Sequence, residues 1–364
     1  MDFKNKLDKE IGFKYFSRVP AKEQSVLAKR LAFLIKAGVP ILDGLKTLQR
    51  QTRSRSKAKL FDRVIDDVAN GQYLSTSLAK SKSIFGDFAV NMIRVGEESG
   101  TLNENLDYIS EELKKRHALK RTVRGALIYP VFVAAMSLLV TSMILVFVFP
   151  KILPIFKDLG GRLPVTTKIL IGTSDFLLHY GIFVLAGLIL TTVAFIFTYK
   201  KTPKFKYALD RIAISLPIFG KLARDYQSAN LCRTLGLLLK SQQNITSAIT
   251  ITASTLSNDV YRRGMEEMSV SVMRGMKMSE HMEKYPILFP EMTLQAVSVG
   301  EMSSNLVDTL IYLSDYYEHE VEETTKSLSS SLEPILMVGM GLLVGFIVVS
   351  VITPIYAITQ NIHP

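Results

Sequence analysis

Few side chains in this sequence could carry out chemistry, and the most notable are two carboxylates that recur. Val95-Gly96-Glu97 is repeated 204 residues later as Val299-Gly300-Glu301, each time beside a predicted break between helices. Carboxylates placed in this way could bind a cation or contact a partner, so Glu97 and Glu301 are weak metal candidates. The alternative is that both are solvated residues at helix ends. Without a pocket, two separate carboxylates do not predict a catalytic pair.

No other pattern predicts a catalytic or cofactor site. The sequence lacks a Gly-x-x-x-x-Gly-Lys-Ser/Thr loop for nucleotide phosphates, and it lacks a nucleophile elbow. Cys232 is the only cysteine, and its apolar helical surroundings predict a small buried hydrophobic residue. The sequence therefore predicts no enzyme, no cofactor and no confident metal site. The five histidines are dispersed without ligand-like spacing: His117, His179, His281, His319 and His363.

The elements that hold these residues form a duplicated unit. Leu27–Pro150 matches Leu231–Pro354 at a constant spacing of 204 residues, with no insertion. Each copy begins polar and ends in a long apolar run, which predicts one soluble-plus-membrane module used twice. The residues that recur include Leu27 and Leu231, Leu31 and Leu235, Ile41 and Ile245, Gly71 and Gly275, Leu102 and Leu306, and Pro130 and Pro334.

The polar part of each copy predicts a bundle of about six amphipathic helices. Leu27, Leu31 and Leu34 repeat at helical spacing, and Gly38-Val39-Pro40 ends that helix and starts the next. Strand-like alternation is nearly absent from the chain. The predicted fold is therefore all-α, a polytopic membrane protein with two duplicated helical bundles and three transmembrane helices.

Three apolar runs are long enough to cross a bilayer, which takes about 20 residues of helix. They contain no Asp, Glu, Lys or Arg of the kind that marks a transport path. Pro130 and Pro334 lie near the starts of the first and third runs and predict a kink there. Gly341 and Gly345 form a small-xxx-small pair that would let another helix pack closely.

Basic residues at the ends of the spans predict the topology. Six Lys and Arg residues between 114 and 124 precede the first span, and Lys200, Lys201, Lys204, Lys206 and Arg211 follow the second. By the positive-inside rule both flanks face the cytoplasm, so the N-terminus is cytoplasmic and the C-terminus periplasmic. The predicted parts are a cytoplasmic segment (1–21), the first module (22–125), a span (126–150), a periplasmic segment (151–179), a span (180–199), a cytoplasmic linker (200–225), the second module (226–333), a span (334–359) and a periplasmic end (360–364).

The two modules carry opposite charge. Residues 22–124 hold 20 Lys and Arg against 12 Asp and Glu, whereas residues 226–330 hold 8 against 13. Opposite charge favours docking of the modules on each other or on different partners. The basic half shows no aromatic-interleaved stretch, so nucleic acid is not a predicted partner.

Several stretches resemble a known family. They are Leu27–Pro40, Gly96–Leu102, Tyr129-Pro130, Leu163-Pro164, Ser174–Leu177 and Leu216–Gly220. They resemble the inner-membrane platform proteins of type IV pilus assembly and type II secretion, often called the secretion system F proteins. The resemblance implies a bacterial inner-membrane scaffold that contacts a cytoplasmic hexameric ATPase, other inner-membrane assembly proteins, and pilins or pseudopilins. It also implies a homo-oligomer, and it makes Gly96, Gly100 and Gly300 structural or interaction residues.

The second copy departs from the family pattern twice. Ser241-Gln242-Gln243 stands where the first copy has Ala37-Gly38-Val39, and Ser303-Ser304 replaces Ser99-Gly100. Both changes remove a glycine, which puts a tight turn there in question. The predicted function is a platform that couples an ATPase to pilin extraction and polymerisation, with the short chain favouring a pilus. The alternatives are the equivalent platform of a secretion system, a membrane transporter, and an enzyme with an unrecognised site.

Overall fold

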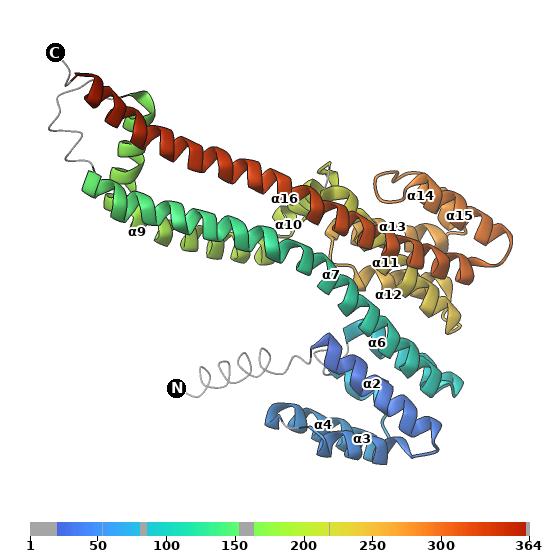
Figure 1. The fold of residues 1–364 in the computed structure, drawn as a ribbon. Coiled ribbons are helices and arrows are strands. Elements are labelled where there is room, and N and C mark those ends of the chain that lie inside the picture. The colour runs from blue at the N-terminus through green and yellow to red at the C-terminus, as the bar shows by residue number, and fades with distance from the viewer. Residues whose placement is uncertain (1–19, 53, 81–85, 153–163, 218, 362–364) are drawn as a thin grey trace. The chain divides into compact units, whose positions relative to one another are not determined.

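The computed structural model describes residues 20–52, 54–80, 86–152, 164–217 and 219–361 (Figure 1). These residues form fourteen α-helices and no strand, as the sequence predicted. Most of the predicted segment 1–21 and part of the predicted segment 151–179 lie outside the described residues. The α-helices are α2 (Ala21–Lys36), α3 (Ile41–Arg50), α4 (Arg55–Ala69), α5 (Leu74–Lys80), α6 (Gly86–Ser99), α7 (Leu102–Met143), α9 (Val165–Lys201), α10 (Pro203–Ser215), α11 (Phe219–Lys240), α12 (Ile245–Thr255), α13 (Asp259–Met273), α14 (Met278–Met282), α15 (Glu291–Met302) and α16 (Leu306–Asn361).

The two modules repeat one order of six helices. Helices α2–α7 build the first module and α11–α16 the second, and each ends in the helix that continues into an apolar run. Helix α3 begins at Ile41 and α12 at Ile245, and α5 begins at Leu74 and α14 at Met278. The predicted duplication and the predicted six helices per module are confirmed.

Apolar side chains at helical spacing fill the interior of each module. Leu31 of α2 and its counterpart Leu235 of α11 are 4% and 0% exposed. Burying such a side chain contributes roughly 1.5–3 kcal/mol, so helices too short to be stable alone are held by their apolar faces. Cys232 is among these buried residues, and burial raises the pKa of its thiol to about 12. It is therefore the small buried residue that the sequence predicted.

Helix α9 is longer than the predicted second span, and the predicted linker contains helical structure. Helix α9 begins at Val165, although the sequence placed the start of the second span at Tyr180. The predicted linker 200–225 contains α10 and the start of α11. Asp210 anchors α10 to the second module, because its carboxylate accepts a hydrogen bond of 2.8 Å from the Asp259 amide. Helix α10 thus depends on a contact that is made only in the folded chain, and the bounds of the linker stay a prediction.

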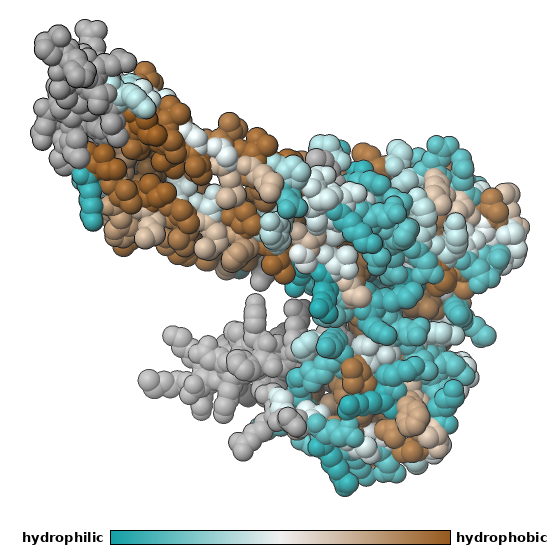
Figure 2. All heavy atoms as spheres, viewed as in Figure 1, coloured by the Kyte–Doolittle hydropathy of each residue, from teal (hydrophilic) through white to brown (hydrophobic). Residues whose placement is uncertain are grey.

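Three helical segments are long and apolar enough to span a membrane: Leu102–Ile152, Val165–Tyr199 and Leu306–Thr353. Figure 2 shows hydrophobic side chains over these helices and mostly hydrophilic ones over the two modules. Helix α7 contains Pro130, and α16 continues through the position of Pro334. A kink at either proline stays a prediction.

One end of the apolar helices is held by a specific contact. The π-helical turn Ile144–Val148 follows α7 directly, and Leu145 and Phe149 pack there against Leu170 of α9. The hydroxyl of Ser174 donates a 2.6 Å hydrogen bond to the Leu145 carbonyl oxygen. A π-helical turn changes the usual i to i−4 pairing, so an acceptor of this kind is satisfied by the neighbouring helix.

Contacts divide the chain into two compact units. One contains Met1–Arg121 and Tyr207–Glu322, and thus both modules. The other contains Thr122–Lys206 and Glu323–Pro364, and thus the apolar helices. Glu97, Glu301 and the glycines beside them lie in the first unit, whereas Pro130, Pro334, Gly341 and Gly345 lie in the second.

Candidate functional site

The repeated Glu97 holds the start of a neighbouring short helix. Its carboxylate oxygens accept hydrogen bonds from the backbone amides of Leu74 and Ser75, at 2.6 and 3.0 Å. These amides begin α5, where the first four N–H groups of a helix have no partner inside it. A carboxylate at this end also suits the positive end of the helix dipole. Glu97 therefore acts as a cap supplied by a different helix, α6.

Glu301 makes the same contact in the second module. It accepts hydrogen bonds from the amides of Met278 and Ser279, at 2.7 and 3.1 Å, and from the Ser279 hydroxyl at 2.6 Å. The repetition of Glu at this position thus reflects a repeated helix cap. The sequence left two roles open for both residues: a solvated carboxylate, or a contact with a cation or a partner. The structure adds a third role, the capping of a neighbouring helix of the same chain.

The glycine before each glutamate allows two helices to approach closely. A Cβ added at Gly96 would lie 2.8 Å from the Leu102 Cα, at the start of α7. A Cβ added at Gly300 would lie 2.7 Å from the Thr309 Oγ1 of α16. Each Gly-Glu pair therefore joins three helices: the glycine packs on the long helix and the glutamate caps the short one. We call these two sites the Gly-Glu joints.

The two turns that lose a glycine keep the left-handed backbone conformation. Gly38 has φ of 82° and its counterpart Gln242 has φ of 63°. Gly100 has φ of 76° and its counterpart Ser304 has φ of 56°. The turns are therefore preserved, although a non-glycine residue is rarely found in this region. The loss of the two glycines therefore leaves the shape of the turns unchanged, but it adds the conformational strain of a non-glycine residue in the left-handed region.

Ser241, beside one of these turns, contacts the first module. Its hydroxyl lies 3.1 Å from the Asn105 Oδ1 of α7 and is also within bonding distance of the Met92 sulfur. Asn105 is buried and donates to the Met92 carbonyl at 3.0 Å. The departure from the family pattern at Ser241 therefore coincides with a contact between the two modules.

A cluster of charged side chains continues this contact. Arg233 of α11 is 9% exposed and lies 2.7 Å from Glu318 and 3.0 Å from Asp315, both of α16. Its Nε lies 3.7 Å from the carboxylate of Glu112, which α7 of the first module supplies. Lys115 of α7 pairs with Asp315 at 3.1 Å. We call Arg233, Glu112, Lys115, Arg116, Asp315 and Glu318 the inter-module charge cluster.

Arg116 connects the cluster to a second buried group. It pairs with Glu112 at 2.9 Å and donates to the Thr234 hydroxyl of α11 at 3.0 Å. Burial raises the pKa of Glu318, although the nearby Arg233 and Lys115 oppose the rise. The cluster contains three acids and three bases, and the buried charges of Glu112 and Arg233 are each paired, as a buried charge requires if it is to remain ionised. The opposite net charges of the modules meet in the pair of Lys115 with Asp315, whereas the pair of Arg233 with Glu112 joins a base of the acidic module to an acid of the basic one.

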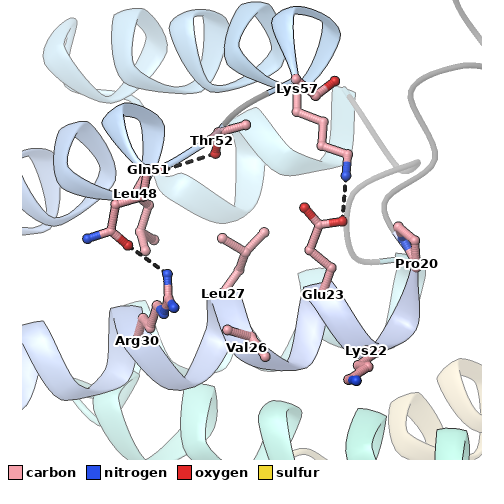
Figure 3. Close-up of a pocket in the computed structure, with 11 residues that line it drawn as sticks. Pro20, Lys22, Glu23, Val26, Leu27, Arg30, Leu48, Gln51, Thr52 and Lys57 are labelled. Atoms are coloured by element: carbon pink, nitrogen blue, oxygen red, sulfur yellow. Dashed lines mark hydrogen bonds and ion pairs between the residues drawn. The ribbon is translucent and has the colours of Figure 1, made fainter.

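A pocket of about 570 Å³ opens in the first module between α2, α3 and the start of α4 (Figure 3). Val26, Leu27 and Leu48 give it an apolar lining. Arg30 donates to the Gln51 side chain at 2.6 Å, and Lys57 pairs with Glu23. The charged groups are therefore engaged with each other at the rim. No pair in this set resembles a nucleophile with its base.

The described residues contain no group of three His, Cys, Asp or Glu side chains placed to hold a metal ion. His281 is buried and hydrogen-bonded to Ser271 through Nδ1, at 3.0 Å. Burial lowers the pKa of His281. Around Gly341 and Gly345, an added Cβ would meet no described heavy atom within 4 Å. Those two glycines therefore have no close packing partner within the described chain, and their proposed role stays a prediction.

Comparison with known proteins places these features in a family context. The family described as type II secretion system protein F matches residues 27–150 and 231–354, which are the two sequence copies. Gly96 and Glu97 lie in the first matched segment, and Gly300 and Glu301 in the second. The matched segments together cover more than half of the chain.

Curated relatives are similar over nearly the whole chain. The type IV pilus assembly protein PilC of Thermus thermophilus is 34% identical over 97% of this chain and 86% of the relative. PilC of Pseudomonas aeruginosa is 28% identical over 93% of this chain and 90% of the relative. The type II secretion system protein F of Aeromonas hydrophila is 29% identical over 94% of this chain and 87% of the relative.

Proposed function

Since this chain belongs to the type II secretion system protein F family, we propose that it is the inner-membrane platform of a type IV pilus assembly machine. In this role it is a scaffold and not an enzyme. It couples a cytoplasmic hexameric ATPase to the extraction of pilins from the membrane and their polymerisation. The observation that carries the pilus assignment is the 34% identity, over 97% of the chain, to a protein named for pilus assembly.

The structural features support a scaffold. The charged groups of the Gly-Glu joints and of the inter-module charge cluster are used for helix caps and ion pairs: Glu97 and Glu301 bind backbone amides, and Arg233 binds carboxylates. Three long apolar helices suit a membrane-embedded base, and the proposed partners are the ATPase, other inner-membrane assembly proteins, pilins and further copies of this chain. Nucleic acid is not among the proposed partners.

A second candidate is the equivalent platform of a type II secretion system, with pseudopilins as partners. It is favoured by the relatives named as protein F of that system, which are 25–29% identical. A membrane transporter is a less favoured alternative from another class. Its spans would need charged or polar groups near the middle of the bilayer, and the sequence supplies no charged residue there.

Deleting the gene in its own bacterium separates these roles. We expect loss of surface pilin with unchanged secretion of folded exoproteins, and restoration by the wild-type chain. Loss of secreted exoproteins with normal pili would favour the secretion platform instead. Normal pili and normal secretion, together with altered uptake of a small solute, would reject both platform assignments. Purification of the tagged chain from crosslinked membranes should recover the ATPase and pilins, with an unrelated tagged membrane protein as the control.

The proposed orientation places both modules in the cytoplasm and Pro364 in the periplasm. A reporter enzyme that is active only in the periplasm should be active when fused after Pro364 and silent when fused after Lys201. The opposite pattern would reverse the orientation. A reporter that is active in the cytoplasm provides the matched control at both positions.

A further inference from the structure

Two hollows share a wall at α10, in the second module. One, of about 330 Å³, is lined by Tyr207, Arg211 and residues of α13 and of the segment after α14. The other, of about 510 Å³, is lined by Tyr207, Arg211 and the apolar end of α10. We propose that together they bind an anionic glycerophospholipid, with its phosphate headgroup in the first hollow and its acyl chains along the second. This inference goes beyond the platform role and does not depend on it.

The first hollow is basic. Arg211 comes from α10, Arg263 from α13 and Lys284 from the segment after α14, and all three are exposed. The guanidinium of Arg263 lies over the ring of Tyr207, at 4.6 Å from its centre. Glu267 is the one carboxylate in the lining, and it accepts a hydrogen bond from the Tyr285 hydroxyl.

The charges of this hollow therefore match a phosphate group. Within the described residues, none of Arg211, Arg263 and Lys284 makes an ion pair. Guanidinium groups bind phosphate oxygens in a two-pronged geometry, and an ammonium adds a compact positive charge. Three basic groups from separate parts of the chain, facing one space, favour a single phosphate over a diffuse attraction to a charged surface.

The second hollow and its surroundings are apolar. Ile212, Leu216 and Pro217 line it. Ile212 is 56% exposed and Leu216 is 44% exposed, and Ile287, in the lining of the first hollow, is 55% exposed. Apolar side chains beside basic ones on an exposed surface are typical of segments that lie in the membrane interface. A soluble phosphate compound would use the basic part only, whereas a phospholipid would use both.

A short stretch of sequence connects this site to a membrane-spanning helix. Helix α10 begins at Pro203, after α9 ends at Lys201, and the ring of Phe205 packs on that of Phe195 in α9 with centres 5.7 Å apart. Arg211 comes about ten residues after Lys201, and a helix of that length extends about 15 Å. Along the chain, Arg211 therefore follows closely after the end of the span.

The test uses the full chain, purified in a neutral detergent and titrated with tail-labelled fluorescent phospholipids. We expect phosphatidylglycerol to bind at least about ten-fold more tightly than phosphatidylcholine, since each of the three basic residues near an anionic lipid contributes about five-fold. Combined substitution of Arg211→Gln, Arg263→Gln and Lys284→Gln should abolish that preference. Arg211→Gln alone should lower the preference for phosphatidylglycerol. Because this single change is at an exposed position, it tests the site even if the triple variant misfolds.

The matched control is a triple variant of the first module, Lys36→Gln, Arg50→Gln and Arg94→Gln, which removes the same charge from exposed positions. It should keep the wild-type preference for phosphatidylglycerol. The uncharged variant Ile212→Gln with Ile287→Gln should weaken phosphatidylglycerol binding several-fold, because it removes the apolar contact. Equal binding of the two lipids by the wild type would overturn the proposal, as would an unchanged preference in the first triple variant. Displacement of the lipid by glycerol phosphate at similar concentration would show a site for soluble phosphates instead.

Discussion

Arg233 Nη2 lies 2.7 Å from Glu318 Oε2, and the same guanidinium reaches Glu112 of the other module through its Nε at 3.7 Å. One buried cation thus serves carboxylates from α7 and α16. Glu112 is 1% exposed, and its Oε2 has no hydrogen bond within the described residues. Arg233 therefore faces this oxygen, whereas Arg116 pairs with the other carboxylate oxygen of Glu112, at 2.9 Å.

Replacing Arg233 should destabilise the protein strongly. Arg233→Gln leaves the buried carboxylate of Glu112 with Arg116 alone, and the half-buried carboxylate of Glu318 with the more distant Lys115. The loss of the central cation costs up to about 3–5 kcal/mol of the free energy of unfolding. Lys29 occupies the equivalent position of the first module and pairs with Asp107 at the surface, at 3.1 Å. Lys29→Gln should therefore cost less than about 1 kcal/mol. Chemical unfolding of both variants in detergent measures the difference, and equal effects would show that the cluster is not effectively buried.

Replacing the helix caps should have a moderate effect. Glu97→Gln and Glu301→Gln each keep one acceptor oxygen but lose the charge at the start of α5 or α14, so each should cost about 1 kcal/mol. The neighbouring exposed Glu98→Gln is the control and should have little effect. Unfolding free energy and membrane abundance are measured beside pilus or secretion output. Output that fell at normal abundance and stability would favour the cation or interface role of these glutamates.

The Gly-Glu joints should not accept a larger residue than glycine. Gly96→Ala places a methyl group 2.8 Å from the Leu102 Cα of α7. Gly300→Ala places one 2.7 Å from the Thr309 Oγ1 of α16. Overpacking of this kind costs about 1–3 kcal/mol. Gly125→Ala is the control in helix α7, because its added Cβ meets no described heavy atom within 4 Å. That variant should gain up to about 1 kcal/mol from helix propensity, and a loss equal to that of Gly96→Ala would argue against the steric explanation.

Restoring glycine to the strained turns should stabilise the second module. Gln242→Gly and Ser304→Gly relieve a left-handed conformation that costs a non-glycine residue roughly 1 kcal/mol. Ser303→Gly, at φ of −88°, should give no such gain and is the matched control. The thermal unfolding midpoints should rise for the first two variants and not for the control, and an equal rise in all three would contradict the strain explanation. Because Ser241 contacts Asn105, it is left unchanged in these variants.

The stability of the second module should fall as pH rises through the titration of Asp225. Burial raises the pKa of Asp225 from 3.8 to about 6, despite the nearby Lys221. The folded state therefore binds the proton more tightly than the unfolded state, so stability declines from about pH 4 to pH 6 and stays lower above. Asp225→Asn should recover about 2–3 kcal/mol at about pH 7.5 and nothing below about pH 4.

Asp67 is the control, because its pKa is shifted in the opposite direction to that of Asp225. Its hydrogen bond from Ser77, and then the one from Lys80, lower its pKa below 3.8. The stability it contributes is present above its unfolded pKa and is lost as pH falls through the lower folded value. Asp67→Asn should therefore reduce stability at neutral pH, whereas Asp225→Asn should increase it. The same sign for both variants would contradict the assignment for Asp225.

Much of the fold could be predicted because it depends on local periodicity. The 204-residue repeat and the apolar spacing led to two six-helix modules, and lengths alone led to three spans. Helix α10 was not predicted, since its anchor, the contact of Asp210 with the Asp259 amide, exists only in the folded chain. Helix α9 begins at Val165, fifteen residues before the predicted span 180–199, because a helix can continue beyond the apolar run that the sequence reveals.

The candidate sites were harder to predict because their partners come from non-equivalent positions. Arg233 corresponds to Lys29, and Glu112 corresponds to Tyr316, so the repeat gives no sign that Arg233 and Glu112 meet. The sequence did give one indication, because Arg233 lies in α11 between Leu231 and Leu235, which both belong to the apolar core. Glu97 and Glu301 were noticed because they recur, but only coordinates could show that their partners are backbone amides, which nearly every residue type carries.

The π-helical turn Ile144–Val148 also sets the angular phase of the residues after it. One extra residue in a turn rotates every later side chain by about 100° relative to an uninterrupted α-helix. Phe149 packs with Leu170 of α9 because of that rotation, in the same cluster as Leu145. Deleting a single residue from the turn would swing Phe149 toward a different side of the helix and remove the acceptor of Ser174. The end of this span therefore tolerates changes of residue type far better than changes of residue number.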